Sequence, residues 1–372
     1  MALTRYRLGD LIELREERNA AHQYGINDVR GVNNLKKLIR TKASLDGRDL
    51  TKFQIVEPGT FFFNHRTSRN GSKISVTYNY EDKPIIVTED YVLFDCADTS
   101  IINPTWLYIY MCRAEFDRYA IMNSWGSSTE FFNWEDMCDI KIELPPIEVQ
   151  RKYVAIYEAM CENQRCYEAG LEDLKLACDA ELEHIRDTEN NWIPLREVID
   201  EVDIRNTDLE CKMPYGITMD KDVIVSKANT TNLHLYKLMY PGQLACNLLH
   251  VGRDKAYPIA KNEMDTPIAV SQSYLVFETK GIDPDYLLAW FSREETGRYG
   301  WFLGDDNIRS SISLERFLDM DIPLPNSGIQ NSVAYLMRAY RKRKEINEKL
   351  KSQIKDLCPI LIKGSLEEAN RA

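Results

Sequence analysis

The chain has 372 residues, of which 44% are hydrophobic and 28% charged, and its formal net charge is −11. This length favours two or more domains. No run of about 18 apolar residues is present, so we expect no membrane span. The acidic total argues against a protein that coats nucleic acid indiscriminately, because binding to phosphates needs Lys and Arg.

The N-terminal residues and the cysteines indicate an intracellular protein. The chain reaches charged side chains at once, without an apolar stretch followed by small residues, so we expect no secretion signal. Nine Cys without a C-x-x-C pair are typical of reduced thiols rather than of a disulfide or zinc framework. We therefore expect a cytoplasmic protein.

The elements predicted for the first half are strands followed by a helix. Residues 72–79 and 84–95 are rich in β-branched and aromatic side chains and end in turn residues, which predicts strands. Asn103-Pro104 is a typical helix start. The amphipathic run behind it predicts a helix over 105–119, with surface ion pairs in its Arg-x-Glu-x-x-Arg-Tyr end.

The second half repeats this order. A strand is predicted over 267–277 and a helix over 285–299 behind Asp283-Pro284. Turn-forming and polar identities recur at offsets of 187, 183 and 180 residues, which indicates a duplicated unit rather than chance similarity of apolar patterns. Examples of the recurring pairs are Asn19/Asn206, Pro58-Gly59/Pro241-Gly242, Asn64/Asn247, Arg113/Arg293, Leu144-Pro145/Leu324-Pro325 and Gln150/Gln330.

Each half closes with a long helix that carries a narrow apolar seam. Apolar residues recur at spacings of three and four in 148–186 and in 328–362, a pattern typical of coiled coils. Residues 148–187 hold 5 basic and 10 acidic groups, whereas residues 331–372 hold 10 basic and 5 acidic groups.

Opposite charge and matching seams predict that the two helices pack against each other antiparallel. We expect Asn163 to lie opposite Arg343 or Asn347 and to set the register of the seam. The alternative is two separate helices, each covering its own domain.

Motifs of common enzymes are missing from the sequence. It has no G-x-x-x-x-G-K-[ST], G-x-G-x-x-G, H-E-x-x-H or G-x-S-x-G pattern. Asn103-Pro104-Thr105-Trp106 is faintly similar to an amino-methyltransferase motif, but helix capping explains it better. Glu278-Thr279-Lys280 could end a nuclease metal site, although a charged strand terminus is the commoner arrangement.

Basic clusters are the more promising candidates for a binding site. Residues 36–73 hold nine basic and three acidic groups, and residues 223–261 hold five basic groups and one acidic group. The loops within them mix groups that bond base edges with groups that fit phosphates. A solvated surface face would look similar, but two tethered basic modules in an acidic chain favour a reader of two DNA segments.

The sequence resembles the DNA specificity subunits of type I restriction-modification enzymes over nearly all of its length. The resemblance is carried by the duplicated plan and by three segments: LPPIEVQRKYVAIYEAM at 144–160, GLEDLKLACDAELEHIR at 170–186 and IPLPNSGIQNSVAYLMRAY at 322–340. In that family a Leu-Pro pair, a short link and a Gln start each long helix, which Gln150 and Gln330 match. The second copy departs by having Asn-Ser-Gly where the first has Pro-Ile-Glu.

The resemblance implies an α+β fold in which two similar target recognition domains, related by pseudo-twofold symmetry, are separated by an antiparallel pair of long coiled-coil helices. The expected parts are target recognition domain 1 (1–147), the central spacer helix (148–187), target recognition domain 2 (188–327) and the C-terminal spacer helix with its tail (328–372). Each domain would read one half of a bipartite, asymmetric DNA site. The helices would act as a ruler, since major-groove readers on one DNA face stand about 34 Å apart.

The resemblance also implies the partners and the absence of catalysis. The expected partners are double-stranded DNA, two methyltransferase subunits and, through them, restriction/translocase subunits. The chain itself would be a non-catalytic specificity subunit without a cofactor, while S-adenosylmethionine, ATP and Mg would belong to the partner subunits. The alternatives are a scaffold or decoy that binds methyltransferase subunits without reading DNA, and an autonomous restriction enzyme.

Individual DNA contacts are chosen from the basic clusters and their polar neighbours. The loops 126–129 and 307–310, which precede the long helices, are second candidates. The predicted contacts are Lys36, Lys37, Arg40, Lys42, Arg66, Arg69, Asn70, Lys73, Asn247, His250, Arg253, Lys255 and Arg309.

Overall fold

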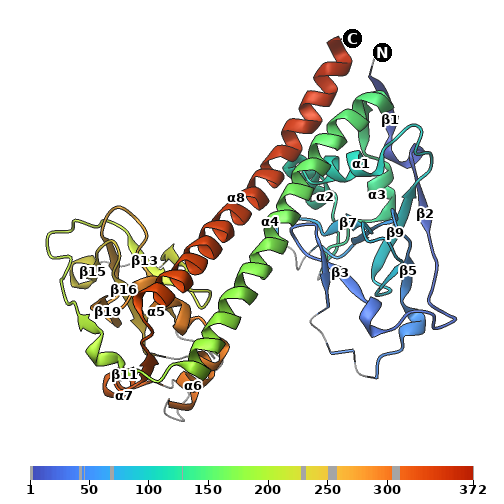
Figure 1. Cartoon of the computed structure of the whole chain (residues 1–372). Coiled ribbons are helices and arrows are strands. Elements are labelled where there is room, and N and C mark those ends of the chain that lie inside the picture. The colour runs from blue at the N-terminus through green and yellow to red at the C-terminus, as the bar shows by residue number, and fades with distance from the viewer. Residues whose placement is uncertain are drawn as a thin grey trace. The chain divides into compact units, whose positions relative to one another are not determined.

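The computed structural model describes residues 3–41, 44–45, 47–67, 71–127, 129–227, 232–249, 258–303 and 311–371. These residues form two compact units, Met1–Arg165 with Glu348–Ala372, and Cys166–Asn347. Each unit holds the β-rich part of one half of the chain and one end of each long helix (Figure 1).

The first half is a set of short antiparallel strands followed by helices. Its largest sheet has the order β2-β9-β6-β7, and β1 pairs with β10, β3 with β4, and β5 with β8. Short 3₁₀ turns occur at Leu8–Asp10, Ile26–Asp28 and Leu50–Lys52. The elements are β1 (Thr4–Arg7), β2 (Ile12–Arg15), β3 (Arg30–Val32), β4 (Leu38–Arg40), β5 (Gln54–Val56), β6 (Phe61–Asn64), β7 (Val76–Tyr78), β8 (Ile85–Val87), β9 (Tyr91–Cys96), α1 (Pro104–Met111), α2 (Ala114–Met122), α3 (Trp134–Cys138), β10 (Lys141–Leu144) and α4 (Ile147–Thr188).

The second half has the same order of strands and α-helices, so the prediction of two similar α+β halves is confirmed. Its sheets have the orders β12-β19-β16-β17, β14-β13-β18-β15 and β11-β20. The 3₁₀ turns lie at Leu195–Glu197 and Leu233–Leu235. The elements are β11 (Trp192–Pro194), β12 (Ile199–Glu201), β13 (Pro214–Ile217), β14 (Val223–Val225), β15 (Lys237–Met239), β16 (Leu244–Asn247), β17 (Ile259–Lys261), β18 (Ile268–Val270), β19 (Tyr274–Thr279), α5 (Pro284–Phe291), α6 (Glu294–Leu303), α7 (Leu314–Leu318), β20 (Asp321–Pro323) and α8 (Ser327–Arg371).

Several predicted elements are divided in the structure. The strand predicted over 84–95 is two strands, β8 and β9, because the chain turns at Thr88, whose carbonyl accepts the N–H of Tyr91 at 3.2 Å. The helix predicted over 105–119 is also two, α1 and α2. Arg113 is extended there, with its guanidinium 3.9 Å from the centre of the Tyr110 ring and bonded to the Tyr110 carbonyl, so its side chain takes the place of a further helical hydrogen bond.

The long helices α4 and α8 pack antiparallel, as predicted. In the first unit, Lys152 Nζ lies 2.7 Å from Glu368 Oε2, so the start of α4 meets the end of α8. In the second unit, the Arg343 guanidinium of α8 lies over the ring of Tyr167 in α4, 5.1 Å from its centre. The predicted place of Asn163 in the seam is wrong, because Asn163 is exposed and the neighbouring Gln164 is buried.

One glutamine fixes the start of each long helix to the preceding helices. Gln150 Oε1 accepts the N–H of Asn103, which caps α1, at 2.8 Å, and its Nε2 donates to the Pro145 carbonyl at 2.8 Å. Gln330 makes the same pair of bonds to the N–H of Asp283, at 3.0 Å, and to the Pro325 carbonyl, at 2.8 Å. Both side chains are buried and satisfy backbone groups at a helix start.

Candidate nucleic-acid interface

The loops that hold most of the predicted contacts leave equivalent strands in the two halves. Asn64 ends β6, and its Oδ1 accepts the N–H of Arg66 at 3.0 Å. Asn247 ends β16, and its Oδ1 accepts the N–H of Leu249 at 3.1 Å. Each asparagine thereby starts a side-chain-stabilised turn and is partly occupied by its own loop.

The first residues after each of these strands are bonded to a segment just before the next short helix. In the first half, the N–H of Phe132 donates to the His65 carbonyl at 2.8 Å. In the second half, the N–H of Ile312 donates to the Leu248 carbonyl at 3.0 Å. Along the chain, the candidate loop 126–129 comes shortly before the first of these bonds. The candidate loop 307–310 lies outside the described residues.

The first of these loops carries an ion pair and a histidine. Arg66 lies 2.9 Å from Asp90, and their side chains are 43% and 41% exposed. An exposed pair of this kind is weak, so the guanidinium can be exchanged between Asp90 and another anion at little cost. Burial, and then the neighbouring Arg66, lower the pKa of His65 below its usual range, which favours the neutral ring at pH 7.

The remaining described candidates of the first half differ in exposure. Lys37 and Arg40 are exposed, and Lys73 is half-buried. The interpretation of Lys36 as a DNA contact must be corrected. Its side chain is 4% exposed, and its ammonium lies 2.6 Å from Asp117 and 2.7 Å from the Met111 carbonyl, so it is part of the core.

In the second half, Asn247 is half-buried. The remaining predicted contacts of both halves lie outside the described residues. They are Lys42, Arg69 and Asn70 in the first half, and His250, Arg253, Lys255 and Arg309 in the second.

Trp125 is a candidate that the sequence analysis missed. It is 68% exposed and pairs with Phe131 through two backbone hydrogen bonds of 2.9 and 3.0 Å. The segment after it therefore forms a hairpin beside the loop that contains His65. A large apolar ring held outward by a backbone ladder can stack on a base or a sugar. The signal available in the sequence was a tryptophan next to Gly126-Ser127.

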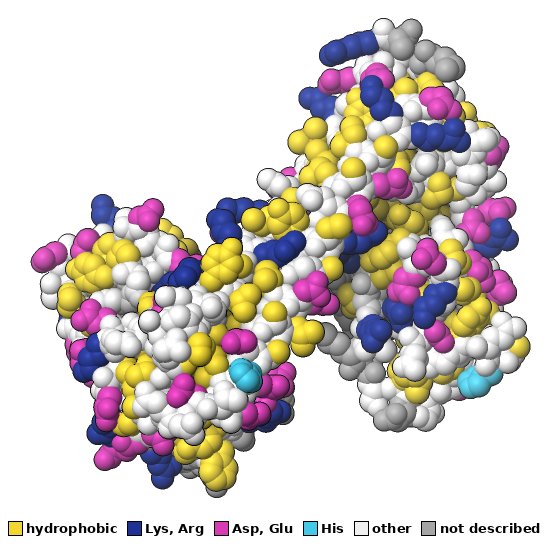
Figure 2. All heavy atoms as spheres, in the orientation of Figure 1, with side chains coloured by type: hydrophobic (Ala, Val, Ile, Leu, Met, Phe, Trp, Pro, Cys, Tyr) yellow, Lys and Arg dark blue, Asp and Glu magenta, His cyan; other side chains and the backbone are white. Residues whose placement is uncertain are grey.

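Charge on the surface is mixed. Lys and Arg side chains alternate with Asp and Glu on the face seen in Figure 2. One groove of about 570 Å³ on the first unit is lined by Glu13, Glu17, Glu57 and Asp95 together with Arg15. Phosphates would be repelled by this groove, so any DNA-reading surface of the unit lies elsewhere.

The residues suspected of metal chemistry form ordinary contacts. Glu278 and Thr279 end strand β19, and Lys280 pairs with Asp200 of β12 at 2.5 Å. Within the described ranges, no group of three or more His, Cys, Asp or Glu side chains is placed to hold a metal ion. The same part of the chain contains no helix long and apolar enough to cross a membrane.

The chain resembles known proteins in its structure. No family model matches the sequence, and no curated protein matches it significantly. Among solved structures, the S subunit of a type I restriction-modification system from M. genitalium matches with a TM-score of 0.60 and 12% identity, covering 98% of this chain and 96% of that one.

Two further structures match over the whole length at lower scores. The HsdS subunit from Thermoanaerobacter tengcongensis gives a TM-score of 0.37 at 15% identity, covering 100% of this chain and 97% of that one. A chain from a structural study of complex assembly and conformational transition in the type I R-M system gives 0.42 at 14% identity, covering 99% and 97%. From the match with the M. genitalium subunit, the chain has the fold of a type I restriction-modification S subunit.

Proposed function

We propose that this chain is the DNA sequence-recognition subunit of a type I restriction-modification complex. Residues 1–147 and 188–327 would each read one half of a bipartite, asymmetric site, and residues 148–187 and 328–372 would form the spacer. The observation that carries the proposal is the duplicated pair of loops, each leaving an equivalent strand at Asn64 or Asn247 in a chain with the S subunit fold.

The candidate residues divide into two roles. Arg66, Lys37 and Arg40 would contact phosphates, where charge matters more than hydrogen-bond pattern. The neutral ring of His65 and the exposed indole of Trp125 would contact bases or sugars. Different loop sequences in the two halves then produce an asymmetric site.

Catalysis would belong to other subunits. Two methyltransferase subunits would dock on this chain and bring S-adenosylmethionine, and through them restriction/translocase subunits would bring ATP and Mg. The chain would contribute the position of the site and no reacting group. It would act in the cytoplasm, where the DNA is.

The test is to co-express the chain with its methyltransferase partner in a host without adenine methylation and to map the methylated adenines. We expect one split, asymmetric motif. Arg69→Ala should alter the first half-site only and Lys255→Ala the second only, with a loss of about 1 to 3 kcal/mol where the residue contacts a base. Lys212→Ala, at an exposed lysine outside both loops, is the matched control.

Two of the following outcomes would overturn the proposal, and the other would overturn its assignment of each loop to one half-site. A methyltransferase complex that forms without sequence-dependent methylation would indicate a scaffold or decoy. Equal effects of Arg69→Ala and Lys255→Ala on both half-sites would remove the assignment of one loop to one half-site. Cleavage of DNA by the purified chain with Mg would indicate an autonomous enzyme.

A further inference from the structure

Two cysteines from distant parts of the chain meet in the first unit. Cys112 is the residue at which α1 ends, and Cys358 lies in the last part of α8. Both pack in the same hydrophobic core, where Cys358 is 2% exposed and Cys112 is partly exposed. The DNA-reading proposal uses neither thiol.

The packing of α1 against α8 brings the two thiols opposite each other. Trp106 Nε1, near the start of α1, donates to Ser365 Oγ of α8 at 3.2 Å. From this bond, Cys112 lies six residues further along the chain and Cys358 seven residues back, which is about 10 Å along each helix. The side chains of Cys112 and Cys358 are accordingly in hydrogen-bonding contact, so the two helices run antiparallel here.

The surroundings give the two thiols different reactivity. The hydrogen bond with Cys358 lowers the pKa of Cys112, and the Lys36 ammonium lowers it further, while burial and Asp117 oppose this shift. Lys36 is held at this place because its Nζ bonds the Met111 carbonyl at 2.7 Å. The same contact between the thiols, followed by burial, raises the pKa of Cys358. Cys112 is therefore the thiol that becomes a nucleophilic thiolate, and Cys358 is its protonated partner.

Most other thiols of the chain lack this activation. A thiol that is held protonated reacts slowly with oxidants. Burial raises the pKa of the thiols of Cys96, Cys138, Cys161, Cys178, Cys211 and Cys246.

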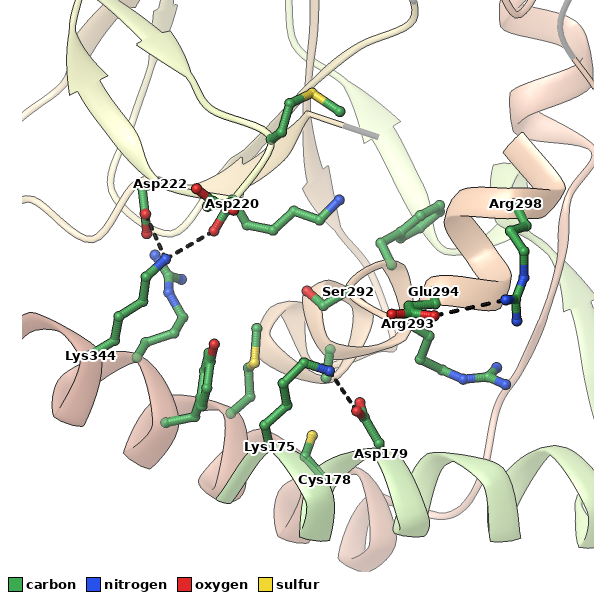
Figure 3. A pocket seen from close by; sticks show the side chains of 17 residues that line it. Lys175, Cys178, Asp179, Asp220, Asp222, Ser292, Arg293, Glu294, Arg298 and Lys344 are labelled. Atoms are coloured by element: carbon green, nitrogen blue, oxygen red, sulfur yellow. Dashed lines mark hydrogen bonds and ion pairs between the residues drawn. The ribbon is translucent and has the colours of Figure 1, made fainter. Parts of the chain in front are cut away.

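The second half has a different pair at the equivalent place. At the 180-residue offset, Cys112 corresponds to Ser292 and Cys358 to Cys178, and Ser292 ends α5 as Cys112 ends α1. Cys178 and Ser292 line the same cavity of about 780 Å³ within the second unit (Figure 3). The Ser292 hydroxyl donates to the Leu288 carbonyl at 2.7 Å. Because a hydroxyl cannot form a disulfide, the pair of thiols is a feature of the first half.

We propose that Cys112 and Cys358 form a reversible oxidation site, at which hydrogen peroxide converts the two thiols to a disulfide that joins α1 to α8. Both residues belong to the first unit, so the bond would fasten the first recognition domain to the end of the C-terminal spacer helix. The second domain, with Ser292, would remain without such a bond. The proposal is independent of DNA reading.

The chemistry takes place in two steps. Cys112 Sγ attacks one oxygen of hydrogen peroxide, the O–O bond breaks, and the released hydroxide takes up the thiol proton and becomes water. The product is a sulfenic acid on Cys112. Cys358 Sγ then attacks Cys112 Sγ, the S–O bond breaks, and the leaving hydroxide takes up the proton of Cys358 as a second water. A dithiol reductant restores both thiols by exchange and is itself oxidised to a disulfide.

The experiment treats the purified full chain with increasing hydrogen peroxide and then blocks the remaining thiols with iodoacetamide. Mass spectrometry of the non-reduced digest should find a peptide that joins Cys112 to Cys358, and dithiothreitol should remove it. The bond should also raise the thermal unfolding temperature of the first unit by roughly 4 to 16 °C, because it restricts the unfolded chain. Dithiothreitol should reverse this rise.

Three variants separate the steps from one another and from folding. Cys112→Ser introduces the residue of the second half and should give a folded chain without the cross-link and without the rise. Cys358→Ala should leave the sulfenic acid on Cys112 without a partner, so that dimedone labels Cys112 in this variant and not in the wild type. Cys161→Ser is the matched control, because Cys161 of α4 lies near enough to raise the pKa of Cys358, and it should leave the cross-link unchanged.

Several results would each overturn the proposal. One is the absence of the joined peptide at peroxide concentrations that already oxidise methionines. Another is a peptide that joins Cys358 to Cys161 instead. Absence of dimedone from Cys112 in Cys358→Ala would refute the order of the steps, and equal unfolding temperatures of oxidised and reduced wild type would refute the fastening of α1 to α8.

Discussion

The buried pair of Lys36 and Asp117 makes a quantitative prediction about what holds the first unit together. Asp117→Ala would leave the Lys36 ammonium, 4% exposed, with the Met111 carbonyl and no carboxylate. It would also orphan the N–H of Ile74, which donates to Asp117 Oδ1 at 3.2 Å. Breaking one side of a buried ion pair costs about 3 to 5 kcal/mol, because water cannot replace the missing partner.

The measurement is urea and thermal unfolding of the full chain, followed at the transition of the first unit. A loss of about 3 to 5 kcal/mol in a unit of this size lowers Tm by roughly 6 to 20 °C. Asp90→Ala is the matched control, because Asp90 also pairs with a cation, Arg66, but at the surface. The control should change the unfolding free energy by about 1 kcal/mol or less.

A double variant distinguishes charge from simple packing. Lys36→Met combined with Asp117→Ala removes both charges and should lose less than the sum of the single variants, since no charge is left buried alone. If Asp117→Ala and Asp90→Ala destabilise the chain equally, the reasoning fails. The buried carboxylate would then contribute no more to stability than one in a surface ion pair.

Three further predictions use the same physical arguments. Gln150→Ala should lower the unfolding free energy in urea by about 2 to 3 kcal/mol, because the buried N–H of Asn103 loses its acceptor; no change would show that the helix start is fixed by other contacts. Burial lowers the pKa of Lys221 in the folded chain to about 8, whereas the unfolded chain keeps the ordinary value of 10.5. The unfolded chain therefore binds more protons between these pH values, and the unfolding free energy of the wild type should rise with pH in this window. The rise should be missing in Lys221→Met, and parallel urea midpoints for the two proteins across this window would refute the shift. Asp90→Asn should raise DNA affinity of the assembled complex several-fold at low salt, because it removes a carboxylate that pairs with Arg66 and repels phosphates; an unchanged affinity would separate this ion pair from DNA binding.

The architecture could be predicted because its signals are local or repeated. The long helices follow from apolar spacing, and the duplication follows from identities such as Gln150 and Gln330 that keep their spacing over a half-chain. The division of the helix predicted over 105–119 could not be foreseen, since no Gly or Pro marks it. The helical period continues across Arg113, and only the folded side chain shows that it ends α1.

The candidate site was less predictable because exposure depends on distant partners. Lys36 and Lys37 are adjacent and equally basic in the sequence, yet one is buried and the other exposed. What decides between them is Asp117, which is 81 residues away along the chain. A basic cluster in a sequence therefore indicates where cations gather but does not separate those that face solvent from those that hold the core.

The identities between the halves show which interactions a duplicated unit has retained. Asn19 bonds backbone groups of Tyr24 and Leu50, and the equivalent Asn206 bonds those of Cys211 and Leu233. Gln150 has the same kind of role as these asparagines, because its side-chain amide bonds buried backbone groups that no apolar residue could satisfy.

Contacts between side chains have changed more freely. The bond between Tyr78 and Thr105 is replaced by an ion pair between Lys261 and Asp285, and the pair of Lys36 with Asp117 has lost its acid at Gly297. A side-chain pair can be exchanged for another of similar shape, whereas an orphaned backbone group remains costly whatever surrounds it. Backbone-satisfying residues are therefore the better guide to equivalent positions in the two halves. The exchanged side chains are the better guide to where the two halves differ in their chemistry.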